Sequence, residues 1–409
     1  MRARSRDRAR PSALAPFWEI DFTGRSAGYS TTAPSGFAYA QAASISSVQT
    51  GTSTLVTIPS TADVVRIGRL DDAWELGLVH EPPRINYLAW SYDFSQQGSP
   101  GKWIDSPSSV SITRTAGKTD PSGGSLATRV QIAAATHQLG ENSALAMPGE
   151  TAATASVWIR NGTPNVNFYR SLGGRIGSTA SAGASWSRVS ISGAIAGAET
   201  TALVPVDGRD WSAIGGLTAG TRDVEIFGAQ REGGTYPTSL IPSNGAQTAR
   251  AGGNARVLAA RWMPHASKRL SLEIRFHALA SRAELEGMPY LWHTFDNASA
   301  FFTPSTGVLT IRDTSGATNT CTLPAWSRYD LVELWISYGG GAATVVKYRL
   351  NGGSVVTLVV LGSALASVVT ATSRDLYVMN ANNAPSGHVS SIVHRIRGYS
   401  DGCVPAWAA

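Results

Sequence analysis

Few residues of this 409-residue chain have the types and spacing of a catalytic site. The stretch Gly398-Tyr399-Ser400-Asp401-Gly402 fits the G-x-S-x-G pattern of a nucleophile elbow. That elbow needs a strand-to-helix turn and a later histidine as base, whereas the last histidine, His394, precedes the serine. The seven histidines are scattered, and no pair has the i,i+4 spacing with a glutamate that zinc proteases use. We therefore predict no catalytic residue, and the chain is not expected to be an enzyme.

Two pairs of carboxylates have spacings that merit consideration for glycan cleavage: Asp207 with Asp210, and Glu284 with Glu286. Both pairs lie in polar or turn-like stretches, so solvated surface charge is the favoured interpretation. Oxygen atoms of the first pair, or of Asp296-Asn297, are candidates for a structural calcium site, but no full ligand loop is present. The chain also lacks a G-x-x-x-x-G-K-[ST] phosphate loop, so no cofactor is expected.

Aromatic side chains beside polar groups form the remaining candidate site. Sugar rings stack on flat aromatic faces while neighbouring polar groups bind the hydroxyls. The segment 292–297, Trp-His-Thr-Phe-Asp-Asn, combines both types, and a glycine-rich loop follows Tyr338. The alternative is that Trp292 and Phe295 are core residues of a strand, because buried aromatics dominate sandwich cores. The predicted glycan-binding residues are Trp292, His293, Asp296, Asn297 and Tyr338.

Composition narrows the class of protein. The formal net charge is +6, but charged residues make up only 15% of the chain, so it does not resemble a polybasic nucleic-acid binder. The two cysteines, Cys321 and Cys403, are interpreted as isolated thiols. No apolar segment follows the basic N-terminus, which argues against a secretory signal. Residues 1–16 are interpreted as a solvated tail, with an arm that docks on an acidic partner as the alternative.

One uncharged run, Ser354 to Ser373, approaches the length of a membrane helix. It is rich in Val, Thr and Ser, follows Asn351-Gly352-Gly353, and is interrupted by Gly362-Ser363. Two buried strands joined by a loop explain this pattern better. No membrane insertion is expected.

Strand patterns recur along the chain, with turn residues between them and almost no helical periodicity. Residues 270–276 alternate apolar and polar types, and Asn351-Gly352-Gly353 between two strand-like runs is a strong hairpin signal. Residues 224–250 are interpreted as the last strand of a sandwich followed by a polar, proline-containing segment through which the chain leaves the sandwich, the exit. The predicted fold is all-β: a small N-terminal region over 1–80, a sandwich over 81–250, and a second sandwich over 251–409.

The first sandwich resembles a known module. The segments GLVHEPPRINYLAWSYDFSQ (77–96), ASVWIRN (155–161), SWSRVSIS (185–192) and IFGAQREGGTYPTSLIPSNGAQTAR (226–250) follow one another as in a module common in bacteriophage tail, fibre and spike proteins. The sequence departs from that pattern at Pro83, Tyr87 and Ser243. Members of the family resemble carbohydrate-binding jelly rolls, and the resemblance therefore implies a jelly roll over residues 81–250.

The second sandwich is similar to concanavalin-like (laminin-G-like) domains. The similarity lies in the order of a strand around Trp335, the Asn351-Gly352-Gly353 turn, and a return strand over 390–396. This pattern is looser than the first one.

Together the two resemblances imply a virion structural appendage: a fibre, spike or tail component. It would be assembled in the bacterial cytoplasm, attach to the particle through residues 1–80, contact host-surface glycan, and form a homo-oligomer with other virion proteins as partners. One alternative is a decoration or cement protein that joins neighbouring virion subunits. Another is a polysaccharide-degrading enzyme on the concanavalin-like scaffold, for which a concave face lined with paired acids would be the sign.

Overall fold

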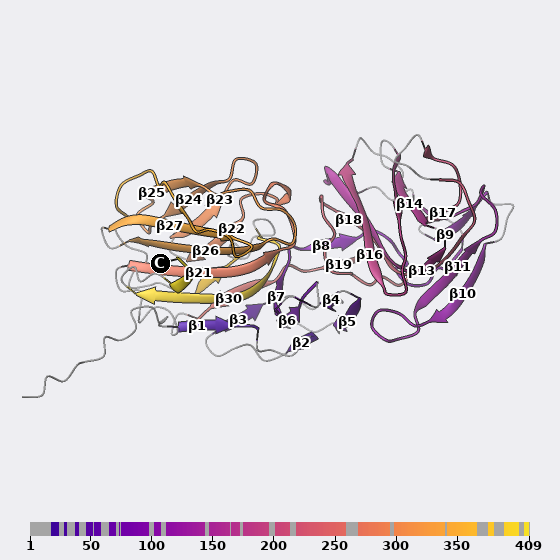
Figure 1. Cartoon of the computed structure of the whole chain (residues 1–409), viewed down its shortest axis with the longest axis horizontal. Coiled ribbons are helices and arrows are strands. Elements are labelled where there is room, and N and C mark those ends of the chain that lie inside the picture. Colours follow the sequence, from indigo (N-terminus) through magenta and orange to yellow (C-terminus); the bar gives the residue numbers. More distant parts are fainter. Residues whose placement is uncertain are drawn as a thin grey trace, which may run out of the picture. The chain divides into compact units, whose positions relative to one another are not determined.

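The computed structural model consists almost entirely of β-strands (Figure 1). It describes residues 18–23, 28–30, 37–40, 46–51, 53–58, 65–70, 73, 75–97, 102–107, 112–143, 147–163, 165–171, 175–195, 201–212, 218–258, 269–294, 298–339, 342–365, 375–379, 388–400 and 405–408. The helical elements among these residues are two 3₁₀ turns, η3 (Arg282–Glu284) and η4 (Ala406–Ala408). The predicted all-β class is confirmed, and no described segment forms a helix with the length and hydrophobicity needed to span a membrane.

The chain divides into two compact units. The first consists of Met1–Gly24, Ala33–Tyr39 and Asn254–Ala409, and the second of Arg25–Thr32 and Ala40–Gly253. The divide at Gly253 lies close to the predicted limit after residue 250. The predicted N-terminal region 1–80 differs from this division, because its segments are shared between the two units. The Arg-rich stretch 1–16 lies outside the described residues.

The second unit is a sandwich of two antiparallel five-stranded sheets. One sheet has the strand order β10-β11-β18-β13-β16, with bounds Thr113–Lys118, Ala127–Ile132, Arg222–Gly233, Ala152–Thr163 and Ser187–Ala194. The other has the order β15-β14-β17-β12-β9, with bounds Arg175–Ala180, Val166–Ser171, Thr201–Asp207, Gln138–Ser143 and Trp103–Ser106.

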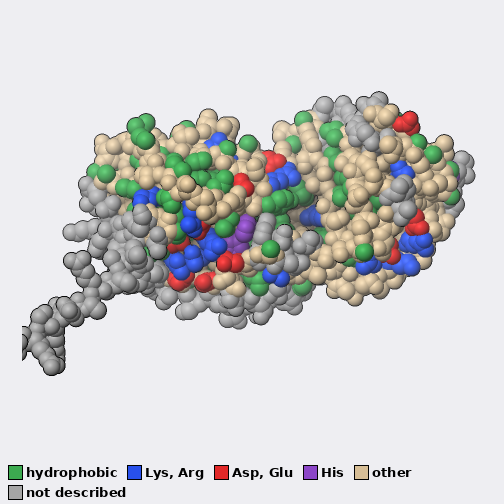
Figure 2. Space-filling view, viewed as in Figure 1, with side chains coloured by type: hydrophobic (Ala, Val, Ile, Leu, Met, Phe, Trp, Pro, Cys, Tyr) green, Lys and Arg blue, Asp and Glu red, His purple; other side chains and the backbone are tan. Residues whose placement is uncertain are grey.

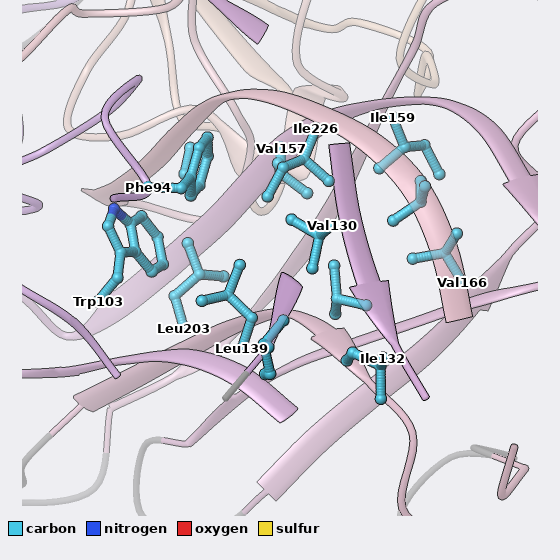
Figure 3. Close-up of a cluster of buried hydrophobic side chains, with 14 of the residues drawn as sticks. Phe94, Trp103, Val130, Ile132, Leu139, Val157, Ile159, Val166, Leu203 and Ile226 are labelled. Atoms are coloured by element: carbon cyan, nitrogen blue, oxygen red, sulfur yellow. The ribbon is translucent and has the colours of Figure 1, made fainter. Parts of the chain in front are cut away.

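The core of this sandwich lies between its two sheets. Val157 and Ile226 from one sheet and Leu203 from the other are fully buried and point toward one another (Figure 3). Phe94 and Trp103 pack ring against ring, with centroids 4.7 Å apart. Each such side chain contributes roughly 1.5–3 kcal/mol when it is fully buried. The period-two pattern of the sequence thus supplies one hydrophobic layer.

Shorter elements complete the second unit. β4 (Ser46–Gly51) and β5 (Thr54–Ile58) form a hairpin, and β6 (Val65–Gly68) pairs with β2 (Gly28–Ser30) and β7 (Gly77–His80). β8 (Arg84–Asn86) leads into the sandwich and β19 (Thr248–Arg250) leaves it, and the two pair antiparallel. The lead-in and the exit of the sandwich therefore lie side by side.

The first unit also contains two sheets. One has the order β30-β21-β26-β27-β28, with β1 paired to β30; the bounds are Ser391–Ser400, Arg269–Ala278, Leu331–Gly339, Ala342–Leu350, Val356–Leu358 and Trp18–Asp21. The other has the order β25-β24-β23-β22-β29-β20-β3, with bounds Thr318–Thr322, Val308–Arg312, Ser299–Phe302, Tyr290–Thr294, Leu376–Val378, Asn254–Val257 and Phe37–Ala40.

The hairpin predicted at Asn351-Gly352 joins β27 to β28. Both residues have positive φ, 49° and 70°, which a tight two-residue turn requires and which Asn and Gly tolerate best. The Asn351 side chain accepts a hydrogen bond from the Leu331 N–H and donates one to Asp330, each 2.8 Å long. The turn is therefore held by its own side chain as well as by its backbone.

The uncharged run after this turn contradicts one prediction. Its first strand, β28, was expected to be buried, but Val356 is 44% exposed and Val359 just beyond the strand is 80% exposed. β28 is the last strand of its sheet among the described residues, and an apolar pattern alone does not distinguish a central strand from an edge strand. Residues 366–373 of the run lie outside the described part of the chain.

Candidate functional site

Six buried polar residues of segments 77–96 and 226–250 converge on one network in the second unit. Each of the six is at most 9% exposed. Arg66 from β6 joins them from outside the two segments. We name this network the clasp, and its members are Arg66, Glu81, Arg84, Asn86, Gln230, Glu232 and Arg250.

Glu81 is the centre of one half of the clasp. Its carboxylate lies 2.9 Å from Arg66 Nη1 and 3.2 Å from Arg250 Nη1, and it accepts a 2.7 Å hydrogen bond from the Ser239 N–H. Arg250 also donates to the backbone carbonyls of Ser239 and Pro82, at 3.0 Å each. One buried carboxylate therefore links β6, the lead-in and the exit.

Glu232 and Asn86 organise the other half. Glu232 accepts hydrogen bonds from the Gln230 amide at 2.6 Å and from the Thr238 N–H and hydroxyl at 2.8 and 2.6 Å. The Asn86 amide donates to the Ile241 carbonyl at 2.8 Å and accepts from the Arg231 N–H at 3.1 Å. Most of these bonds satisfy backbone groups of the proline-containing segment between β18 and β19, which forms no regular strand.

Electrostatics explain why so much charge can be buried here. Burial alone would raise the pKa of Glu81, but Arg250, Arg66 and the Ser239 N–H outweigh it and lower that pKa to about 2. A buried carboxylate between two guanidinium groups is expensive to assemble and more expensive to break. The clasp has no exposed group that could bind a substrate, so its chemistry is structural.

Two of the predicted glycan-binding residues lie inside the first unit. Trp292 on β22 and Tyr338 on β26 are both 0% exposed, and their rings stack with centroids 4.9 Å apart and an interplanar angle of 27°. Neither ring has a free face for a sugar, so we correct the prediction for these two: they are core residues, the alternative already weighed for Trp292. Asp296 and Asn297 lie outside the described residues.

His293, the remaining predicted residue, lies on the outer face of the same strand. A register shift between Tyr290 and Trp292 places the Tyr290 ring against His293, edge to face at 5.5 Å. Phe301 packs on Tyr290 at 5.2 Å, and the Arg312 guanidinium lies 5.5 Å from the Phe301 ring centre. We name these four half-buried residues, Tyr290, His293, Phe301 and Arg312, the His293 cluster.

The His293 cluster combines the groups that a sugar needs. Burial, together with the nearby Arg312 charge, lowers the pKa of His293, so the imidazole is neutral at pH 7 and has one donor and one acceptor nitrogen. Tyr290 and Phe301 supply ring surface, and Arg312 supplies donors for hydroxyl or carboxylate oxygens. Sequence reasoning found His293 but missed the other three, because the bulge that brings Tyr290 to this face leaves no mark in the sequence.

Charged residues gather on the outer face of the other sheet of the first unit, in the region of β21 and β30 (Figure 2). Glu273 lies 3.1 Å from Arg395 and 3.7 Å from Arg397. On the neighbouring strand Glu333 lies 2.5 Å from Arg349 and 3.7 Å from Arg275. We name this group the arginine face: Glu19, Glu273, Arg275, Glu333, Arg349, Arg395 and Arg397.

Two of the three acids of the arginine face, Glu273 and Glu333, are buried counter-ions rather than free carboxylates. Glu273 is 0% and Glu333 2% exposed, whereas the four arginines are about one-fifth exposed, at 19–23%. The acid pairs predicted from the sequence lie close together along the chain, whereas Glu273 and Glu333 lie on the adjacent strands β21 and β26, so sequence spacing does not indicate them. Arg275 lies opposite Glu333 in the pairing of β21 with β26, so Glu273 and Glu333 lie on the same face of the sheet.

The other sequence candidates have structural partners. Asp207 accepts hydrogen bonds from Arg209 and from Trp211 Nε1, so its oxygens are already engaged, and Glu284 is bonded by Ser281 and Arg328. No group of three or more potential metal ligands occurs among the described residues.

The remaining candidate nucleophiles are Ser400 of the G-x-S-x-G stretch and the two cysteines. Ser400 ends strand β30 and the residues from 401 to 404 lie outside the described part, as does Cys403. Cys321 is a buried free thiol, and burial raises its pKa to about 12. A thiol held in the protonated form is a poor nucleophile, so Cys321 is a core residue.

No model of a known protein family matches the chain, and no curated protein matches it.

Proposed function

We propose that the protein is a structural appendage of a virion, a fibre, spike or tail component, built from a jelly-roll module and a concanavalin-like module. The observation that carries the proposal is the clasp: six buried polar residues of the motif hold the β-sandwich together and do not form a site open to a substrate. A motif of this kind is what a repeated building block needs, since it fixes the architecture and leaves the surface free to vary.

The direct test is the composition of particles. Particles purified from bacteria that carry the coding sequence are analysed by mass spectrometry and labelled with an antibody raised against the full chain. The proposal expects peptides of the chain in intact particles and label at one kind of position. Chain found only in the soluble fraction of the lysate, with none in particles, would refute the virion role.

We place the contact with host-surface glycan at the His293 cluster instead of at Trp292 and Tyr338. On an array of bacterial surface polysaccharides, the full chain should bind a subset of glycans. Phe301→Ala should weaken that binding about tenfold, which corresponds to a loss of about 1.4 kcal/mol. Tyr329→Ala is the matched control, because Tyr329 is an aromatic residue 48% exposed elsewhere in the same unit. Equal binding by both variants would remove the cluster from the proposal.

The architectural alternative, a decoration protein between virion subunits, is favoured by one observation, the exposed apolar residues around β28. It predicts no glycan binding at all, but release of the chain together with a neighbouring subunit when particles are dissociated. The enzyme alternative would need Glu273 and Glu333 to act on a polysaccharide. Depolymerisation of host capsule by the purified chain, abolished in Glu333→Gln, would establish it.

A further inference from the structure

The edge strand β28 and the residues that follow it expose an unusual amount of apolar surface. Val355 and Val356 are 39% and 44% exposed, and Val359 and Leu361 are 80% and 67% exposed. The backbone here is fixed on two sides. β28 pairs with β27, and the Leu361 N–H and carbonyl both bond to Thr320 of β25, at 2.7 and 2.8 Å. We name residues 355–361 the apolar edge.

Two other described edge strands, β10 and β9, carry charges that discourage pairing. β10 contains Arg114 and Lys118, and β9 contains Asp105. Charged side chains on an edge strand are a common protection against association with another strand. The apolar edge lacks this protection: no Asp, Glu, Lys, Arg or His occurs from residue 351 to 373. A long-lived exposed edge without charges would be an aggregation hazard unless something covers it.

We propose that the apolar edge is covered by the apolar edge of a second copy of this chain. A surface without charge offers nothing for a charged partner to pair with, whereas an identical surface meets it without unpaired charges. A two-fold axis brings two β28 strands together antiparallel, so that each supplies backbone donors and acceptors to the other and the valines interdigitate. Because the backbone is already ordered by β25 and β27, little conformational entropy is lost on pairing.

The small area of the apolar edge limits the expected affinity of the dimer. A stable interface buries roughly 800 Å² on each partner, and a short strand with four exposed apolar side chains falls below that. The pairing should therefore be a reversible dimer with a dissociation constant in the micromolar range. This dimer does not depend on a place in a virion, so failure of either proposal leaves the other standing.

Sedimentation velocity on the full chain, from about 1 μM to about 200 μM, tests the proposal over a range that brackets micromolar affinity. The wild type should shift from monomer to dimer. Val359→Lys places two like charges at the contact and should raise the dissociation constant at least tenfold. Met288→Lys, at a residue 55% exposed in the same unit, is the matched control and should dimerise like the wild type. A monomeric wild type, or equal behaviour of the two variants, overturns the proposal.

Hydrogen exchange gives an independent readout if Val359→Lys fails to fold. In the wild type, amides of residues 355–361 should exchange more slowly at high than at low protein concentration, while amides of β10 should not change. Unchanged exchange at 355–361 across concentrations at which the chain associates would overturn the proposal, because association would then use a different surface.

Discussion

Replacement of Glu81 by glutamine tests whether the clasp holds the second unit together. Glutamine keeps the shape of the side chain and removes its charge. Arg66 and Arg250, both at most 1% exposed, would then face each other without the carboxylate that lies 2.9 and 3.2 Å from them. Breaking a buried ion pair by removing one partner costs about 3–5 kcal/mol. A domain is stable by only about 5–15 kcal/mol, so the loss is a large share of the total.

Urea unfolding of the full chain is the assay, since guanidinium chloride would screen the charges under study. Hydrogen exchange on segments 77–91 and 226–243 assigns the transition to the second unit, because the chain has two units and a single transition cannot be assumed. Asp223→Asn is the matched control. It breaks the Asp223–Arg129 pair of the same unit, whose side chains are 35% and 41% exposed, and should shift the transition far less.

Glu81 and Arg250 should be energetically coupled. In the Glu81→Gln background, Arg250→Met should cost less than it does in the wild type, because the guanidinium group has already lost its counter-ion. If Glu81→Gln destabilised the second unit by no more than about 1 kcal/mol, the value typical of an exposed ion pair, the clasp would not be what holds this unit together. Additive effects of the two substitutions would refute the assignment of the pair.

Acid should destabilise the second unit, because the pKa of Glu81 is about 2 in the folded chain against an ordinary 4.5. The difference of about 2.5 corresponds to about 3 kcal/mol of stability, which is complete above pH 4.5 and is lost as the pH falls toward 2. Glu81→Gln should flatten the pH profile of unfolding measured by circular dichroism. Gly228→Ala should destabilise the same unit by about 1–3 kcal/mol in urea, since Gly228 has a φ of 62° and a new Cβ would lie 2.6 Å from the Leu240 side chain. Trp292→Ala should cost about 3–5 kcal/mol of first-unit stability without selectively changing glycan binding, because the ring is fully buried. Cys321 should resist iodoacetamide at pH 8 in the native chain and react after unfolding, as peptide mass spectrometry can show, because burial raises its pKa to about 12.

Strand positions were largely predictable from the sequence. The strand predicted over residues 270–276 lies within β21, the strand predicted around Trp335 is β26, and the Asn351 turn is where it was expected. Alternation of apolar and polar residues and the positions of turn residues are local signals, and they indicate where strands begin and end. Pairing partners are not local: Glu19 of β1 bonds Arg397 of β30 at 2.7 Å across nearly the whole chain. No short pattern could indicate that the first strand completes a sheet with the last one.

The candidate site was less predictable, for three physical reasons. An aromatic residue beside polar ones has the same pattern in a core strand as in a sugar site, and Trp292 proved to belong to the core. A bulge re-aims Tyr290 toward His293 without a sequence signal. The role of Glu284, by contrast, could have been found. Ser281-x-x-Glu284 is a capping-box spacing, and both reciprocal bonds are present.

Most of the second unit is inserted into the sequence of the first, and its sandwich begins and ends at two paired strands. The first unit uses residues on both sides of the second in the sequence, since β1 pairs with β30 while residues 40–253 make up most of the second unit. An inserted domain is tolerated best where its chain ends lie close together, and β8 and β19 are adjacent at the start and the end of the sandwich. Because buried Glu81 joins Arg66 to Arg250 of the exit, we expect the lead-in and the exit to fold cooperatively with the sandwich.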